Sequence, residues 1–559
     1  MPLYGLEPVS LAYGINHYGV DKPYQLLLKV FSREVEDFRK LGEFVGREVY
    51  ELAYRVDRLS QPALFTWGVG GRRADVVWLD PFERMVLERL VRDYGVNKYP
   101  FEGRPWHLHY TGIYLVGDPG ISCILTITIQ TGYALYKYGE GGVREWYLRL
   151  AGLSEPLMWG ATWFTEVQGG SDLGANATRA EPAGGNRYKL YGYKYFASGA
   201  GIADVALVTA RLPGSRSGAK GLSLFVVPRL RGDGRLNYHV RRLKWKSGTV
   251  AVPTGEVELD GSEAYLLGEP DRGIYYAMED LMVSRLANSV GALGIARKAY
   301  LEAYGYTVVR RAFGKRLIEH PLALRDLVEA EAELEAMAAL TLYAVTLFDR
   351  AWYSRPPYNE VYHHARLMTH IAKNLTAEAA SRITATSMEL LGGIGFLHEF
   401  PVERWHREAL ITPIWEGTSN IQAIDMLEAM YKKQAHKPFM EAIEELASNA
   451  EDRKLAEEAL HHAEKALKRV ARDPGNAEFY AKEILRALGY AAATLLLLEA
   501  SRVTGDEGFH TAAKVFWQLR VKGTLDPLPR HEAEELVSLR GGLDEVDWEA
   551  KALRAAPGV

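Results

Sequence analysis

The hydrophobic period of this chain changes twice along its length, and this change restricts the fold more than any other feature. From Tyr24 to Tyr54 and from Pro81 to Asp93, apolar residues recur every three or four positions, the period of a helix with one buried face. After Met158 the pattern alternates residue by residue, as strands do. From about Asp271 the helical period returns. We therefore expect a helical region, a β region and a second helical region, in that order.

Short alternating segments, separated by turn residues at regular intervals, predict a small antiparallel β domain. The first follows the turn residues Gly184, Gly185 and Asn186. The predicted strands are Arg187 to Phe196, Val205 to Ala210, Leu222 to Pro228, Tyr238 to Leu243, and Gly255 to Leu259.

Four helical segments after the β region suit an antiparallel four-helix bundle. They are Ile274 to Arg311, Leu322 to Tyr353, Asn359 to Leu391, and a shorter helix that ends at Tyr431. Thr418 or Ser419 could cap the start of the last one. More helix is expected after Pro438.

The segment from Ile121 to Gln130 is ambiguous. Its β-branched residues favour a strand by propensity, whereas its helical neighbours make a buried helix equally reasonable.

The expected fold class is α+β and mostly α, with four parts. These are an N-terminal helical domain (1–157), a middle antiparallel β domain (158–268), a C-terminal helical bundle (269–436) and an additional helical region (437–559).

Composition excludes several classes of function. A single cysteine, Cys123, leaves no internal disulfide, redox pair or cysteine-based metal site. The net charge of −4 gives no global attraction to nucleic acid or to an anionic membrane. Met1 to Gly5 lacks the pattern of a secretory signal, and the apolar run from Ala491 to Leu498 is too short to cross a membrane. A cytoplasmic location is expected.

Two other patterns favour structure over chemistry. Gly291 and Gly294 resemble part of a dinucleotide fingerprint but lie within a predicted helix, so close helix packing is the better interpretation. His363, His364 and His370 share one predicted helix without a carboxylate-rich partner segment, and no metal site is expected.

Two segments could carry chemistry. The first, Thr165 to Asp172, combines hydroxyl groups with a glycine pair, which fits either an ordinary turn or the approach of backbone to a flat ligand. The second, Trp415 to Asn420, places Glu416 between Trp415 and a helix start. Glu416 could be a desolvated base or a solvated loop residue, and the helix start could offer N–H groups to a phosphate.

Five motifs in order resemble the acyl-CoA dehydrogenase flavoprotein superfamily over roughly residues 80–435. Length, the Gln-Gly-Gly-Ser-Asp form of the first motif and the C-terminal helices look most like its AidB-like branch. The motifs are Thr165-Glu166 with Gly170-Ser171-Asp172, Lys194 to Ser198, Arg310 to Lys315, Leu391 to Phe396, and Trp415 to Ser419.

The resemblance implies FAD as cofactor, a homotetramer, and helix rather than strand from Ile121 to Gln130. It implies that Glu416 removes an α-proton from an acyl thioester while the flavin accepts the β-hydrogen as hydride. Arg285, Trp415 and Ser171 are implied at the substrate, where Arg285 would help to keep Glu416 ionised. The implied FAD contacts are Phe164, Thr165, Gly170, Ser171, Phe196, Ala197, Ser198, Arg310, Phe313, Glu389, Gly392, Gly393, Trp415, Gly417, Thr418 and Asn420.

Some residues depart from the family pattern. Val167 replaces a usual proline, Phe196 a common tryptophan, and Glu389 a frequent glutamine. Ser284 stands where some relatives carry the base, which favours Glu416. Met282 replaces an aspartate near the coenzyme A moiety, which questions recognition of that carrier.

The expected function is an FAD-dependent acyl-CoA dehydrogenase that passes electrons to an electron-transfer flavoprotein. Trp415 and Phe164 favour short or branched acyl groups. The alternatives are an AidB-like, DNA-associated flavoprotein with weak dehydrogenase activity, or a flavoprotein oxidase. Residues 441–559 contain 16 Lys and Arg against 22 Asp and Glu, and this acidic balance disfavours DNA binding. Lys465, Lys468 and Arg469 are interpreted as a solvated helix face.

Overall fold

The computed structural model describes residues 9–555, which form two compact units, each built from separate stretches of chain. The first unit contains the chain up to Glu51, Arg104–Pro119, and everything from Asn288 onward. The second contains Leu52–Gly103 and Gly120–Ala287. Met1 to Gly5, where we expect no secretory signal, lies outside the described residues. The four-part division of the sequence stays a prediction.

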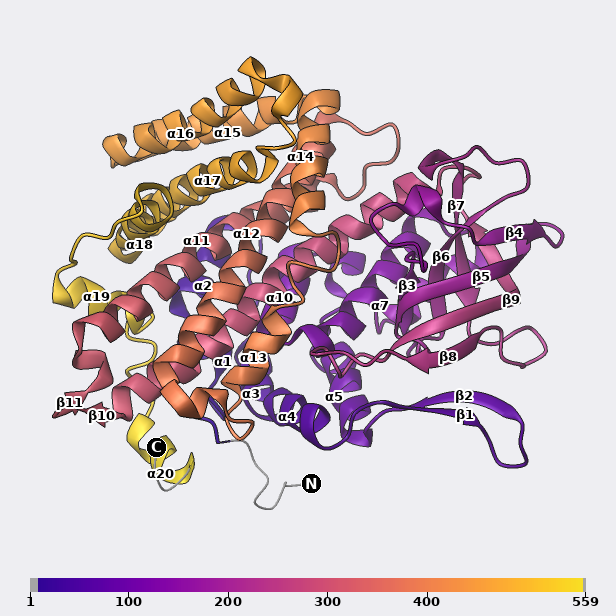
Figure 1. The fold of residues 1–559 in the computed structure, drawn as a ribbon, viewed down its shortest axis with the longest axis horizontal. Coiled ribbons are helices and arrows are strands. Elements are labelled where there is room, and N and C mark those ends of the chain that lie inside the picture. The colour runs from indigo at the N-terminus through magenta and orange to yellow at the C-terminus, as the bar shows by residue number, and fades with distance from the viewer. Residues whose placement is uncertain (1–8, 556–559) are drawn as a thin grey trace. The chain divides into compact units, whose positions relative to one another are not determined.

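The second unit is built around a seven-stranded sheet (Figure 1). β7 pairs with both β9 and β6, so the main strands close into a ring and few edges are left unpaired. The strands of this sheet are β3 (Gly160–Trp163), β4 (Arg179–Pro182), β5 (Arg187–Ser198), β6 (Val205–Arg211), β7 (Leu222–Pro228), β8 (His239–Leu243) and β9 (Thr254–Leu267).

The expected antiparallel β domain also contains two parallel pairings. β3 pairs with β6 in parallel, and β4 also meets β6 in parallel at one residue pair. The strand β3 is the first of the domain. The strand β6, which begins 45 residues after it, lies beside it and runs in the same direction, with Gly160 opposite Val205. The remaining pairings are antiparallel, and β9 extends to Leu267, beyond the expected Leu259.

A hairpin that the sequence pattern did not predict lies within the stretch expected to be helical. Its strands β1 (Ala63–Trp67) and β2 (Arg73–Trp78) are antiparallel. The buried Asp75 on β2 accepts a hydrogen bond from the backbone N–H of Val240 at 3.3 Å and contacts the His239 ring at 3.0 Å. These bonds tie the hairpin to β8.

The ambiguous segment from Ile121 to Gln130 is helical, as the resemblance implies. It lies in α7 (Pro119–Tyr138), and every one of these residues is buried. The hydroxyls of Thr128 and Thr131 donate to carbonyls four residues earlier, at 2.7 and 2.8 Å. A helix therefore satisfies these buried hydroxyls locally, which outweighs the β propensity of the side chains. The α-helices that lie wholly within the second unit are α5 (Pro81–Arg92), α8 (Gly141–Arg144) and α9 (Trp146–Leu150).

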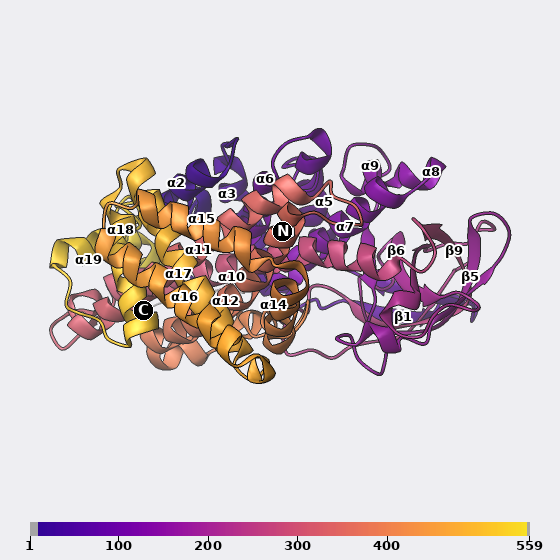
Figure 2. The ribbon, with the colours of Figure 1, turned by 90° about the horizontal axis from the view of Figure 1, so that it is seen from above.

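The first unit is helical, and its long helices pack side by side (Figures 1 and 2). Three expected bundle helices appear as α10 (Gly273–Val309, which begins in the second unit), α11 (Pro321–Ala351) and α12 (Glu360–Leu391); the fourth is α14 (Ser419–Lys433). The others are α1 (His17–Val20), α2 (Lys22–Phe31), α3 (Arg39–Phe44), α6 (Trp106–Val116), α13 (Val402–Ala409), α15 (His436–Asn449), α16 (Arg453–Arg472), α17 (Ala481–Thr504), α18 (Glu507–Trp517), α19 (Arg530–Val537) and α20 (Trp548–Ala555). The helix α4 (Tyr50–Arg58) begins in the first unit and continues into the second.

Gly294 confirms the packing interpretation of the glycine pair. A Cβ at this position would lie 2.1 Å from the carbonyl oxygen of Tyr114 and 2.7 Å from the Cα of Gly117. Only glycine therefore lets α10 approach the end of α6 this closely.

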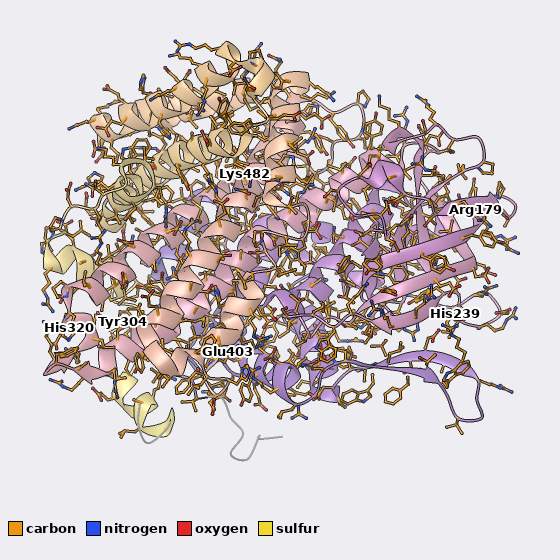
Figure 3. The ribbon with its side chains drawn as sticks, in the orientation of Figure 1. Arg179, His239, Tyr304, His320, Glu403 and Lys482 are labelled. Atoms are coloured by element: carbon orange, nitrogen blue, oxygen red, sulfur yellow. The ribbon has the colours of Figure 1, made fainter. Side chains whose placement is uncertain are left out.

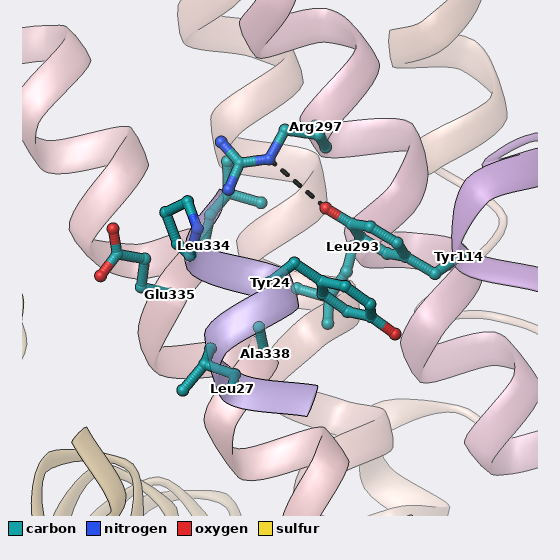
Figure 4. Close-up of a pocket in the computed structure, with 9 residues that line it drawn as sticks. Tyr24, Leu27, Tyr114, Leu293, Arg297, Leu334, Glu335 and Ala338 are labelled. Atoms are coloured by element: carbon teal, nitrogen blue, oxygen red, sulfur yellow. Dashed lines mark hydrogen bonds between the residues drawn. The ribbon is translucent and has the colours of Figure 1, made fainter. Parts of the chain in front are cut away.

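Three fully buried carboxylates on α11 determine how its neighbours pack. Glu331 binds Arg297 of α10, and Glu335 binds Arg540, which follows α19. Figure 4 shows Arg297 and Glu335 around a small cavity, with the Arg297 Nε donating to the Tyr114 hydroxyl at 3.4 Å. Glu333 binds both Arg382 of α12 and Arg520, which lies just beyond α18. Burial raises the pKa of Glu333, but the two guanidinium groups outweigh burial and hold its pKa below the ordinary value.

The apolar helix α17 is the one helix among the described residues that is long and apolar enough to cross a membrane by composition. In the structure, 72% of its apolar window is buried inside the protein, which accounts for its composition.

On neighbouring α16, Lys468 and Arg469 pair with Glu464 and Glu483 at 2.8 and 2.6 Å.

We predict that Arg540→Met lowers the free energy of unfolding by about 3–5 kcal/mol, because it leaves the buried Glu335 without its cation. Chemical denaturation monitored by circular dichroism would measure the loss. Arg530→Met is the matched control, since Arg530 forms an exposed pair with Glu534 and should change stability by less than about 1 kcal/mol. Equal stability of the two variants would contradict a stabilising role of the Arg540–Glu335 pair.

Candidate active site

The expected site residues lie in both units, and each group is described by itself. In the second unit they lie on the segment after β3 and at the end of β5. In the first unit they lie before α14, at the end of α12 and in the turn after α10.

A buried ion pair joins the two segments in the second unit. Glu166 accepts a hydrogen bond from the fully buried Lys194 of β5 at 2.7 Å. The same carboxylate accepts from the backbone N–H of Ala177 and from the hydroxyl of Thr178, at 2.7 and 2.6 Å. Burial raises the pKa of Glu166, but Lys194 and these donors outweigh burial and lower it. The segment that carries Thr165 is thereby fixed to β5.

A β-bulge then turns the end of β5 toward that segment. The pairing of β5 with β9 shifts register between Lys194 and Ala197. The backbone N–H of Tyr195 leaves the ladder and donates to the carbonyl of Thr165 at 3.0 Å. Bulges re-aim side chains in this way, and here the ring of Phe196 is 54% exposed. The structure therefore brings the Thr165 and Phe196 segments together, as the sequence predicts.

The other expected residues of the second unit differ in exposure. Gly170 and Ser171 lie on the exposed loop, whereas Ala197 is buried. Ser198 hydrogen-bonds with the Thr254 hydroxyl at 3.1 Å. Phe164 packs in the core, so a ligand would meet its backbone rather than its ring. Arg285, on α10, is buried.

In the first unit, Glu416 occupies a left-handed turn before α14. Glu416 has φ = 58° and Gly417 has φ = 94°, and the Glu416 side chain is half-buried. The indole N–H of the preceding Trp415 donates to the side-chain oxygen of Asn288 on α10. Thr418 takes the N-cap position of α14, as expected, but its side chain makes no capping hydrogen bond. The backbone, rather than the Thr418 hydroxyl, thus shapes this turn.

Three buried side chains hold the backbone of this turn. Gln422 of α14 donates from Nε2 to the carbonyls of both Glu416 and Gly417, each at 2.9 Å. Lys373 of α12 donates to the Gly417 carbonyl at 2.6 Å. His370, one turn earlier on α12, contacts the Gln422 side-chain oxygen at 2.8 Å.

The sequence patterns assign no role at this turn to any of the three residues. His370 is weighed there as a metal ligand, and no metal site is expected. Lys373 comes from a helix 44 residues before Gly417, whereas Gln422 lies six residues after Glu416 but outside the motif.

The remaining expected residues of the first unit lie on exposed turns. Arg310 precedes a small hairpin of β10 (Arg311–Ala312) and β11 (Lys315–Arg316), and Phe313, in the turn between these strands, is 97% exposed. His320, labelled in Figure 3, braces this turn by a 3.1 Å contact with the Ala312 carbonyl. Glu389 is exposed at the end of α12. The glycines that follow it, Gly392 and Gly393, have open space where a Cβ would stand.

Comparison with known proteins identifies the family. Residues 161–262 match the model of the acyl-CoA dehydrogenase middle domain, and residues 271–431 match that of the C-terminal domain. Acyl-CoA dehydrogenase family member 11 of Caenorhabditis elegans is 30% identical over 464 residues, which cover 79% of this chain and 74% of that protein. The chain belongs to the acyl-CoA dehydrogenase family.

Two further comparisons show how far the likeness extends. The putative acyl-CoA dehydrogenase AidB of Escherichia coli K12 is 30% identical over 412 residues, covering 70% of this chain and 73% of AidB. The crystal structure of C. elegans ACDH-11 in complex with C11-CoA superposes with a TM-score of 0.80 at 25% identity, over 94% of this chain and 95% of that one. The fold and the AidB-like resemblance expected from the sequence are confirmed.

We predict that Lys194→Met lowers the free energy of unfolding by about 3–5 kcal/mol, because Glu166 would stay buried without its cation. Thermal and chemical unfolding would measure this change. Lys189→Met is the matched control, since Lys189 lies exposed on the same strand and should shift stability by no more than about 0.5 kcal/mol. A Lys194→Met protein as stable as the control would contradict the structural role of the pair.

Proposed function

We propose that this enzyme is an FAD-dependent dehydrogenase of acyl-CoA thioesters in which Glu416 is the catalytic base. The observation that carries the proposal is the position of Glu416: a half-buried carboxylate on a left-handed turn whose two carbonyls are bound by buried side chains. A base that removes a weakly acidic C–H proton must be held in a defined place, and this turn supplies that restraint.

The proposed cofactor is FAD, and residues within each unit suit parts of such a group. Phe196 offers an exposed ring for contact with a flat isoalloxazine, beside the backbone of Thr165. Gly392 and Gly393 leave open backbone for close approach. The exposed Arg310 suits a pyrophosphate, and the α14 N-terminus, which no side chain caps, suits an acceptor group.

The proposed reaction forms a double bond between the α and β carbons of the acyl chain. Glu416 takes the α-proton, and the electrons of that C–H bond form the new bond as hydride leaves the β-carbon. Bound FAD supplies the hydride acceptor. Arg285 is the proposed cation at the substrate, and Trp415, fixed by Asn288, is a second proposed substrate contact.

Support for a CoA thioester comes from the relatives, since the ACDH-11 structure contains C11-CoA. We propose an electron-transfer flavoprotein as the acceptor, with the protein working in the cytoplasm as a homotetramer.

Glu416→Gln should lower the rate of flavin reduction by saturating acyl-CoA by a factor of about 10²–10⁴, because an amide cannot accept the proton. Anaerobic stopped-flow absorbance would measure the rate, and flavin content should stay at the wild-type level. Glu441→Gln, an exposed change on α15, is the matched control and should react normally. An unchanged rate of flavin reduction in Glu416→Gln would show that Glu416 is not the base.

Arg310→Ala should weaken retention of FAD, since it removes the cation proposed for the pyrophosphate. Flavin content after gel filtration, together with the molecular mass of the assembly, would be measured. Arg325→Ala removes an exposed arginine paired only within α11 and serves as the control. Equal flavin content in both variants would count against the contact.

A further inference from the structure

We infer that His370, Lys373 and Gln422 form a positioning network that holds the backbone of Glu416 and so aims the catalytic carboxylate. This inference rests on the proposed role of Glu416. All three side chains act on backbone carbonyls or on each other, so they are positioning residues rather than catalytic ones.

The hydrogen-bonding capacity of the Gln422 amide matches its surroundings. An amide NH₂ group has two hydrogens, and its nitrogen lies 2.9 Å from each of two carbonyl oxygens, those of Glu416 and Gly417. Both hydrogens are therefore used. The reverse orientation of the amide would place its oxygen against two carbonyl oxygens, which repel it, so the surroundings fix how Gln422 points.

That orientation assigns a role to His370. The Gln422 side-chain oxygen faces the Nδ1 of His370 at 2.8 Å, and this oxygen can only accept. Nδ1 must therefore carry the hydrogen. The network thus has one direction, from the His370 ring through the Gln422 amide to two consecutive carbonyls before α14.

Lys373 adds a second restraint from the same helix. Its ammonium group donates to the Gly417 carbonyl at 2.6 Å, so that oxygen accepts from both Lys373 and Gln422. A carbonyl oxygen has two lone pairs and can accept both bonds. His370 and Lys373 are three residues apart and lie on one face of α12.

Burial makes these bonds difficult to replace. His370, Lys373 and Gln422 are each 0% exposed, so bulk water cannot take over for a missing partner. Glu416 meanwhile has a left-handed backbone that non-glycine residues rarely adopt. Removing the network therefore lets the turn relax toward ordinary backbone angles and displaces the carboxylate.

The test measures flavin reduction in Gln422→Met, His370→Phe and Lys373→Met under saturating acyl-CoA. Gln422→Met should reduce the rate constant about 10–100-fold, as expected for a displacement of the base on the order of 1 Å, with flavin content and substrate affinity nearly unchanged. Gln434→Met is the matched control, because Gln434 is exposed at the other end of α14 and should react normally.

Two comparisons separate positioning from general stability. If His370 acts through Gln422, the His370→Phe/Gln422→Met double variant should react no more slowly than Gln422→Met alone. His370→Asn, whose amide can donate in place of Nδ1, should recover most of the rate lost in His370→Phe. Effects that multiply in the double variant, or a failure of His370→Asn to exceed His370→Phe, would overturn the network.

A readout without catalysis distinguishes failure of this inference from failure of the proposed function. Amide hydrogen exchange of peptides that span residues 411–421 should be faster in Gln422→Met and Lys373→Met than in wild type, and unchanged in Gln434→Met. Unchanged exchange in all variants would overturn the positioning role. Faster exchange in a protein that no acyl-CoA reduces would support the network while rejecting the proposed dehydrogenation.

Discussion

Buried carboxylates on α11 are the constraint on which the helical unit depends. A carboxylate inside a protein requires a cation and hydrogen bonds, and Glu331, Glu333 and Glu335 obtain theirs from four separate parts of the chain. These contacts fix the register of α10 and α12 against α11, and they attach the C-terminal helices to the same bundle. Because α12 is fixed in this way, its His370 and Lys373 have a defined place from which to hold the turn at Glu416.

In the second unit, one buried ion pair has the same structural role. Glu166 and Lys194 are buried together, and the bulge beside Lys194 frees the Tyr195 N–H to bind the Thr165 carbonyl. A loop and a strand end are thereby held as one surface, with the Phe196 ring exposed. In both units, buried ion pairs determine where the residues proposed for chemistry lie.

Much of this architecture could be predicted from the sequence, because it depends on local patterns. The change of hydrophobic period located the sheet and the long helices, and the ordered motifs indicated the family. The β1–β2 hairpin was missed because its short strands show no strong alternation and are held by Asp75, whose partners are about 165 residues away. The parallel pairing of β3 and β6 also depends on distant residues that no local period reveals.

The residues of the candidate site also fall into those that sequence motifs predict and those that they do not. Glu416, Thr165 and Phe196 could be named from motifs, whereas Gln422, Lys373 and the bulge at Tyr195 could not. The bonds of Lys373 and Tyr195 join segments distant in sequence and depend on packing, and those of Gln422, although local, depend on the left-handed turn at Glu416. His370 illustrates the point, since only the orientation of the Gln422 amide gives its ring a role.

The central claim is that the protein removes a proton and a hydride from an acyl-CoA thioester. Anaerobic titration of the purified flavoprotein with acyl-CoAs of increasing chain length, followed by flavin absorbance, tests it most directly. Stoichiometric bleaching by at least one chain-length class of acyl-CoA is the predicted result. Flavin that dithionite reduces but no acyl-CoA bleaches would contradict it.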